Sequence, residues 1–355
     1  MKKKLLLLLI TSLAVTFQLR AQTLIPISEG INPYGSSEPN QLLKLQDHLY
    51  LFTATNPSIG VELYATDGSQ AGTFLLKDIN PGVGNSFINS FTRINDTVCI
   101  FEANDGSTNH GSEVWRSNGT PSGTYMVEDL TPGPSSTNFN ISNAVLNNKT
   151  FFTTYANGIG ALYITDGDSL GTTQLLSGYN GDYQQSGAVV AVANDIAYFF
   201  IPEDPDYDLH LWRTDGTIGG TFELMDLNMT LFNPRLASAL NGMFIFSASD
   251  SIHGRELWIT DGTVAGTTMI KDLIVGSSGS DPNSPLSLNN KIIFTASLPP
   301  NQAIWATDGT STGTYPLGDS TVFPVATDFW YVGRADSNFY FEANDYNNGD
   351  SILLW

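Results

Sequence analysis

The sequence predicts an all-β protein: a β-propeller of seven four-stranded blades, closed by pairing of the N-terminal strand with the C-terminal blade. Three observations predict this fold. A six-residue phrase recurs every 46 to 51 residues. Each repeat places an Asn- or Asp-rich turn between runs of alternating apolar residues, and no run shows helical periodicity. Periods of about 40 to 50 residues, with four short strands in each, are typical of propeller blades.

The chain begins with a predicted signal peptide, residues 1–21. Three lysines precede an uncharged apolar run from Leu5 to Phe17, and Ala21 offers a small residue for cleavage. The run is shorter than the roughly 20 residues that a membrane helix needs, and no later stretch predicts a membrane span. We therefore expect a secreted or cell-surface protein. Its mature part, residues 22–355, is expected to be a single propeller domain of about seven 48-residue repeats.

The composition restricts the partners. Asp and Glu number 35 against 15 Lys and Arg, which gives a formal net charge of −20. Nucleic acids and anionic membranes repel such a chain, so we expect neither as a partner. Cys99 is the only cysteine, which excludes an intramolecular disulfide. Because Cys99 lies in an apolar run, we expect it to be buried.

The recurring phrase joins an aromatic residue to an Asp-Gly or Asn-Gly turn, as in Trp258 and Asp261. We expect each ring to fill the space between adjacent blades, and each Asp or Asn to accept backbone N–H groups in its turn. The alternatives are a ligand-stacking platform for the rings and a calcium ligand for the acids. The structural repeat residues are Tyr64, Asp67, Trp115, Asn118, Tyr163, Asp166, Trp212, Asp215, Trp258, Asp261, Trp305, Asp308 and Trp355.

Paired turn residues mark the hairpin between the first two strands of each repeat. Asn and Asp tolerate the positive φ angles of a type I′ turn, which we expect at these positions. The pairs are Gln46-Asp47, Asn95-Asp96, Asn147-Asn148, Asn194-Asp195, Asn241-Gly242, Asn289-Asn290 and Asp336-Ser337.

The two ends of the mature chain predict how the ring closes. Residues 23–28 resemble the fourth strand of a blade, and the sequence ends at Trp355 after the third strand of the last copy. The N-terminal strand is therefore expected to complete the last blade, which would pair two otherwise free sheet edges. The alternative is that the sequence is a fragment of a longer array.

The repeat resembles the ELWxxDGT-repeat family of secreted proteins of the Bacteroidetes type. Residues 256–263 read ELWITDGT, and Gly266-Thr267 follows. Other copies depart from this pattern, since Asn118 replaces the Asp and Ser69 replaces the last Thr. The resemblance implies a propeller-like fold and an extracellular or surface location, and it implies no particular activity. Members often carry a C-terminal secretion sorting domain, and no such tail follows the repeats in this sequence.

One acidic loop is a candidate metal site. Asp204, Asp206 and Asp208 alternate along the chain, as carboxylates do in calcium loops. Leu209 stands where such loops need Gly, so a solvated acidic loop is the alternative. Calcium is the only cofactor that the sequence suggests.

No catalytic motif is evident. His110 and His253 occupy equivalent places in two repeats, and the 35 acids offer no unique carboxylate pair. Near-uniform repetition favours a non-catalytic binding or adhesion scaffold for an extracellular glycan or protein, because a catalytic centre breaks a repeat at one place. One alternative is a propeller hydrolase or lyase with a site at the central channel. Another is a structural module of a longer surface protein.

Overall fold

The computed structural model describes residues 31–32, 35–133, 138–156, 159–180, 189–203, 208–230, 237–250, 252–299, 301–317, 326–335, 338–345 and 351–354. Within these ranges the chain forms 27 β-strands and one 3-10 turn at Ser169–Gly171. No helix in the described part of the chain has the length and apolar character needed to cross a bilayer.

The strands form six four-stranded sheets and one three-stranded sheet, in which neighbours in sequence are neighbours in space. We number these sheets blades 1 to 7. Blade 1 contains β1 (Asn40–Gln46), β2 (Leu49–Asn56), β3 (Gly60–Thr66) and β4 (Phe74–Lys77); blade 2 contains β5 (Asn89–Arg93), β6 (Cys99–Asn104), β7 (Ser112–Ser117) and β8 (Tyr125–Glu128); blade 3 contains β9 (Asn138–Leu146), β10 (Lys149–Ala156), β11 (Ile159–Thr165) and β12 (Thr173–Asn180).

The remaining blades follow the same order. Blade 4 contains β13 (Val189–Ala193), β14 (Ile196–Glu203), β15 (Asp208–Thr214) and β16 (Phe222–Thr230); blade 5 contains β17 (Ala237–Leu240), β18 (Met243–Asp250), β19 (Gly254–Thr260) and β20 (Thr268–Lys271); blade 6 contains β21 (Asn283–Leu288), β22 (Lys291–Leu298), β23 (Asn301–Thr307) and β24 (Tyr315–Pro316); blade 7 contains β25 (Ala326–Ala335), β26 (Asn338–Asp345) and β27 (Ser351–Leu354). All pairings within the sheets are antiparallel.

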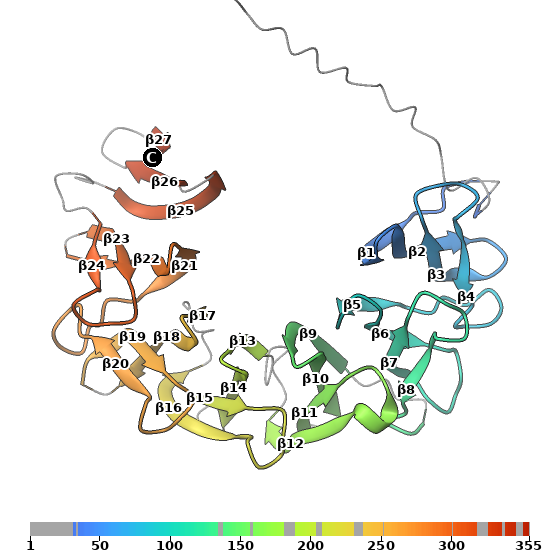
Figure 1. Ribbon diagram of the computed structural model, residues 1–355, viewed down its shortest axis with the longest axis horizontal. Helices are drawn as coiled ribbons and strands as arrows, with labels where there is room; N and C mark the ends of the chain where they lie inside the picture. Colours follow the sequence, from blue (N-terminus) through green and yellow to red (C-terminus); the bar gives the residue numbers. More distant parts are fainter. Residues whose placement is uncertain are drawn as a thin grey trace, which may run out of the picture.

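The blades lie side by side around an arc, with their first strands on its inner side (Figure 1). Blades 1 and 7 lie at the two ends of this arc and do not meet, so the predicted closed ring is not seen. Residues 23–28, which were expected to close it, lie outside the described residues. Four strands per repeat are thus confirmed for six blades, whereas the closing strand stays a prediction.

The core lies between the blades. In blade 1, Leu51 and Leu63 pack with Phe101 and Trp115 of blade 2 in one buried cluster. The equivalents of Phe101 in the next four interfaces are Phe152, Phe199, Phe246 and Phe294. The middle strands have neighbours on both faces, which explains why they read as nearly continuous apolar runs.

The aromatic residue of the phrase lies at these interfaces in blades 2 to 6. Trp115 and Trp305 are buried there, whereas Tyr163, Trp212 and Trp258 pack against their clusters while half-buried. Tyr64 is buried on the face of blade 1 that no other described blade covers. Trp355 lies outside the described residues. Burial of each ring removes a large apolar surface from water and stabilises the contact between two sheets.

The type I′ expectation is confirmed in blades 3 to 6, where both turn residues have positive φ. It is wrong in blades 1 and 2. In blade 1 only His48 is left-handed, with φ of 62°. In blade 2 the Oδ1 atom of Asn95 accepts hydrogen bonds from the backbone N–H groups of Thr97 and Val98, so a side chain organises a wider turn. Asp336-Ser337 lies outside the described residues.

Cys99 is fully buried in the interface between blades 1 and 2. Burial raises the pKa of its thiol to about 12. The thiolate is therefore scarcely formed near neutral pH, and Cys99 acts as a small apolar side chain.

Candidate functional site

The Asp-Gly-Thr turns are closed hydrogen-bonded units. In blade 5, the Oδ1 atom of Asp261 accepts bonds from the backbone N (2.9 Å) and the Oγ1 (2.7 Å) of Thr263. The backbone N of Gly266 donates in turn to Thr263 Oγ1 at 2.9 Å. The backbone bond to the Oδ1 atom recurs at Asp67, Asn118, Asp166, Asp215 and Asp308 in five other blades.

Two threonines lock each turn to the adjoining strands. The Oγ1 atoms of Thr260 and Thr267 lie 2.7 Å apart, and Thr267 Oγ1 donates to the carbonyl of Thr263 at 2.8 Å. The hydrogen bond from Thr263 lowers the pKa of Asp261 below its ordinary value. Backbone and hydroxyl groups thus stabilise the carboxylate within the turn, and its role here is structural.

The acidic loop of blade 4 lies largely beyond what the structure describes. Asp204 and Asp206 are outside the described residues, and Asp208 is the first residue of β15. Calcium binding there stays a prediction. In the described residues, no group of three or more His, Cys, Asp or Glu side chains is arranged to hold a metal ion.

The Glu of the repeat phrase is a buried internal acceptor. The Oε2 atom of Glu62 accepts a bond from the backbone N–H of Ile79 at 2.7 Å, just beyond β4. Burial raises the pKa of Glu62 to about 7. Glu113 and Glu256 make the corresponding bonds to Leu130 and Ile274. Each of these carboxylates therefore holds the chain where it leaves the fourth strand.

Two of the blades without this Glu are built differently. Ala161 and His210 replace it in blades 3 and 4, and the fourth strands β12 and β16 continue for 8 and 9 residues. In the Glu-bearing blades the fourth strand has only four residues. In blades 3 and 4, longer pairing of the fourth strand thus takes the place of the hydrogen bond that Glu62 makes with the backbone in blade 1.

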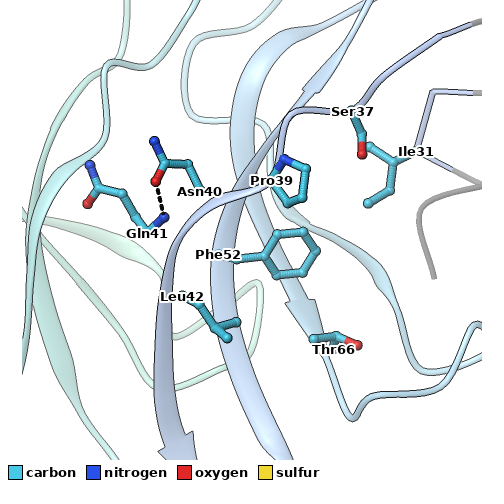
Figure 2. A pocket seen from close by; sticks show the side chains of 8 residues that line it. All are labelled: Ile31, Ser37, Pro39, Asn40, Gln41, Leu42, Phe52 and Thr66. Carbon is cyan, nitrogen blue, oxygen red and sulfur yellow. Dashed lines mark hydrogen bonds between the residues drawn. The ribbon is translucent and has the colours of Figure 1, made fainter. Parts of the chain in front are cut away.

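A cavity of about 500 Å³ lies on the free face of blade 1, lined by Ile31, Ser37, Pro39, Asn40, Gln41, Leu42, Phe52 and Thr66 (Figure 2). Two of its lining residues have counterparts at the interface between blades 1 and 2. Phe52 corresponds to Phe101, and Ile31 corresponds to Ile79. Phe101 and Ile79 pack against blade 1. The cavity therefore lies on the face against which, in later blades, the preceding blade packs. We do not assign a substrate to it.

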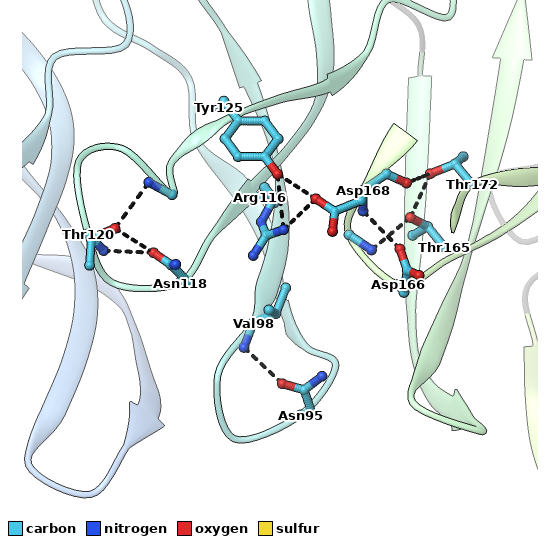
Figure 3. Close-up of polar contacts among 12 residues, drawn as sticks. Asn95, Val98, Arg116, Asn118, Thr120, Tyr125, Thr165, Asp166, Asp168 and Thr172 are labelled. Carbon is cyan, nitrogen blue, oxygen red and sulfur yellow. Dashed lines mark hydrogen bonds and ion pairs between the residues drawn. The ribbon is translucent and has the colours of Figure 1, made fainter. Parts of the chain in front are cut away.

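A polar bridge joins blades 2 and 3. Arg116 of β7 donates to the carboxylate of Asp168 at 2.5 Å, and the Tyr125 hydroxyl also binds this carboxylate (Figure 3). The Arg116 guanidinium lies over the Tyr125 ring, 5.2 Å from its centroid. Asp168 stands where most turns have Thr, so this substitution exchanges a turn contact for a contact between blades.

The β6–β7 hairpin of blade 2 carries a second carboxyl group that burial perturbs as it does Glu62. Glu102 lies opposite Asn89 and Val114, on the face that packs against blade 3. Desolvation raises its pKa to about 7, with a smaller contribution from the charge of Glu113. The equivalent residues in blades 1, 3, 4, 5 and 6 carry no charge: Thr53, Thr153, Phe200, Ser247 and Thr295. Only blade 7 shares the acid, as Glu342.

A His–Asp pair lies at the tip of the same hairpin. The Nδ1 atom of His110 is 2.7 Å from Asp105 Oδ2. The Asp105 carboxylate raises the pKa of His110, and Asp129 and Glu113 contribute in the same direction. Glu113 therefore acts electrostatically on both His110 and Glu102. We call Glu102, Asp105, His110 and Glu113 the blade 2 cluster.

Two neighbouring connections surround this hairpin. The backbone N of Asn104 donates to Ser86 in the preceding connection at 2.8 Å, and Gly133 donates to Asn109 at 2.7 Å from the following one. A Cβ atom on Gly106 would lie 2.0 Å from Asn80 Oδ1, so the loops are in close contact. The hairpin tip that carries Asp105 and His110 thus lies where three loops meet.

Blade 5 contains part of the same arrangement. His253 Nδ1 lies 2.7 Å from Asp250 Oδ2, and Glu256 is buried beside it. Ser247 replaces the acid of Glu102. The sequence indicated that the two histidines are equivalent, but it did not single out Glu102, although its departure from Thr and Ser in other repeats was a visible signal.

No family model and no curated protein matches this sequence. Solved structures do match. One is the S511A mutant of puromycin hydrolase in complex with PGG, at 12% identity and a TM-score of 0.39, covering 91% of this chain and 60% of that one. Another comes from an analysis of two prolyl endopeptidases, at 9% identity and a TM-score of 0.44, covering 90% of this chain and 50% of that one.

A third is the β-propeller domain of the Trilobed protease from Pyrococcus furiosus, described as having an open velcro topology. The identity is 14%, the TM-score is 0.38, and the match covers 90% of this chain and 94% of that domain. This chain thus spans only 60% and 50% of the first two proteins. At such identities the likeness concerns the propeller fold alone.

These comparisons correct one expectation from the sequence. The non-catalytic binding or adhesion scaffold is not supported, because the proteins that they name are a hydrolase, endopeptidases and a protease. The described residues form six four-stranded antiparallel sheets and one three-stranded sheet, and the structural neighbours are propeller-like.

Proposed function

We propose that this chain is a secreted propeller enzyme of the hydrolase class whose acid–base groups are those of the blade 2 cluster. One observation carries the proposal. Glu102 is a desolvated carboxyl group with a pKa of about 7, in a position that is uncharged in the five other four-stranded blades. Perturbed carboxyl groups of this kind concentrate at catalytic sites.

The cluster combines two complementary groups. A carboxyl group with a pKa near 7 is partly ionised at neutral pH, so Glu102 can accept a proton from an attacking water. His110 is held by Asp105, which favours the imidazolium form. That imidazolium can donate a proton to the leaving group. Together the two groups supply the base and the acid that hydrolysis requires.

The charge of the chain indicates which substrates suit the site. With a formal net charge of −20, the protein repels polyanions, and the blade 2 cluster adds three carboxyl groups locally. Neutral or cationic substrates are therefore favoured over acidic ones. We propose a peptide as the substrate class.

Location, family and ring closure belong to the same proposal. The signal-like N-terminus supports export, and the phrase at 256–263 supports membership of the ELWxxDGT-repeat proteins. The unfilled face of blade 1 supports a ring of seven blades in which blade 7 and the N-terminal strand complete the circle. Removal of residues 22–30 should then lower the melting temperature of the exported protein.

The experiment uses the protein purified after export and a library of fluorogenic peptides. We expect hydrolysis that Glu102→Gln and His110→Asn each reduce by about 10²-fold or more. His253→Asn removes the equivalent pair of blade 5, and Glu128→Gln removes an exposed acid from blade 2; both should retain activity. Absence of peptide hydrolysis, or full activity of Glu102→Gln, would overturn the proposal.

A further inference from the structure

Phe87 has an unusual backbone and an unusual exposure. Its φ is 49°, in the left-handed region that a bulky residue adopts only at a cost. Its side chain is 67% exposed, so the ring gains little from burial. Neither local conformation nor packing explains why an aromatic residue occupies this position.

The backbone conformation itself belongs to the repeat. Glu38 in blade 1 and Asp281 in blade 6 occupy the same place, with φ of 44° and 55°. In all three blades the Asn two residues later accepts a hydrogen bond from the next backbone N–H: Asn40, Asn89 and Asn283. At this bend blade 1 has the exposed acid Glu38 and blade 6 has Asp281, which pairs with Arg255 at 3.3 Å, whereas blade 2 has an apolar ring.

Phe87 lies next to the blade 2 cluster. The carbonyl of Ser86 accepts a bond from Asn104, and Asn89 lies opposite Glu102. The same connection carries Val83, which is 78% exposed. Its start is in contact with the hairpin tip through Asn80 and Gly106. Two exposed apolar residues therefore lie on the connection that borders the hairpin of the proposed catalytic groups.

We propose that Phe87 and Val83 form an apolar subsite that binds an aromatic or large aliphatic side chain of the peptide and so positions its scissile bond at Glu102. This inference rests on the proposed function and names its specificity. The neighbouring acids Glu102, Asp105 and Glu113 disfavour an anionic lipid surface as the occupant. They tolerate a neutral peptide side chain.

Hydrolysis provides the first test. Capped fluorogenic peptides are compared in pairs. The two members of a pair differ only at one position, which is Phe in one and Ala in the other, and each position of the peptide is tested in turn. We expect the Phe peptide to have the lower KM, and Phe87→Asn to raise that KM about tenfold while kcat for the Ala peptide is unchanged. Asn tolerates positive φ, so this variant keeps the backbone. Val275→Asn, which removes another exposed apolar side chain, is the control.

Binding without turnover provides the second test. Ketomethylene isosteres of the same two peptides resist hydrolysis, and their affinities are measured by calorimetry. We expect the Phe isostere to bind about tenfold more tightly than the Ala isostere, and Phe87→Asn to abolish this difference. Equal binding of both isosteres, or unchanged discrimination in Phe87→Asn, would overturn the subsite. If discrimination depends on Phe87 but no peptide is cleaved, the subsite stands and the hydrolase proposal fails.

Discussion

Gly220 lies against Asp215 so closely that a Cβ atom on the glycine would be 2.0 Å from the carboxylate Oδ1. The preceding residue, Gly219, has no neighbour within 4 Å of its hypothetical Cβ. A side chain would therefore clash at Gly220, whereas it would extend into open space at Gly219. The same close approach recurs at Gly72, Gly123, Gly171, Gly266 and Gly313, which accounts for the Gly-Thr pair in every repeat.

This contrast predicts unequal effects of alanine. Gly220→Ala should displace the Asp215 carboxylate and lower the free energy of unfolding by about 2–3 kcal/mol, as strained or broken polar contacts do. Gly219→Ala should be neutral or slightly stabilising, by up to about 1 kcal/mol. Urea unfolding of both variants measures the difference. Equal effects would show that the turn can move to accept a side chain.

Trp115 offers a test of the packing between blades. Trp115→Ala should lower the free energy of unfolding by about 3–5 kcal/mol, because it leaves a cavity between blades 1 and 2. Leu170→Ala is the matched control, since Leu170 is fully exposed. Chemical denaturation followed by tryptophan fluorescence and circular dichroism gives both values. A change near zero for Trp115→Ala would contradict the packing role.

Buried Glu62 predicts a dependence of stability on pH. Its folded-state pKa of about 7 lies above the ordinary value of 4.5, so its contribution is fully present below about pH 4.5 and is lost as the pH rises through 7. The loss is on the order of 3 kcal/mol. Glu62→Gln keeps an acceptor for Ile79 and cannot ionise, so it should flatten this part of the profile.

The measurement compares urea unfolding at pH 5 and pH 8. Glu128→Gln, which removes an exposed carboxyl group, should leave the profile as in the parent protein. Glu102, Glu113 and Glu256 also have raised pKa values, so some dependence should remain in the single variant. Identical profiles for Glu62→Gln and the parent would show that Glu62 does not ionise in this range.

Calcium removal tests the acidic loop of blade 4. If Asp204, Asp206 and Asp208 bind calcium, excess Ca²⁺ should raise the melting temperature relative to EDTA, because the ion binds only the folded protein. A triple Asp→Asn variant at these positions should lose the difference. Equal melting temperatures of the parent protein in Ca²⁺ and in EDTA would reject the site.

The repeat determined much of the fold in advance, because Trp258 and Asp261 recur with a period that only four short strands can fill. The details that escaped prediction depend on distant partners. Glu62 binds Ile79, which is 17 residues away and reachable only once β4 is placed. Glu102 could not be selected from 35 acids, since its pKa depends on desolvation within the folded blade.

The self-contained turns have a consequence for engineering. The identities of the two residues between the Thr or Ser and the Gly differ from turn to turn: Gln70-Ala71, Pro121-Ser122, Ile218-Gly219, Val264-Ala265 and Ser311-Thr312. In four of these turns the first of the two accepts a bond through its backbone carbonyl, which does not depend on its side chain. Short recognition peptides could be grafted at these tips one blade at a time. The molecule would then serve as a multivalent display platform, because its framework does not depend on the sequence of the grafted peptides.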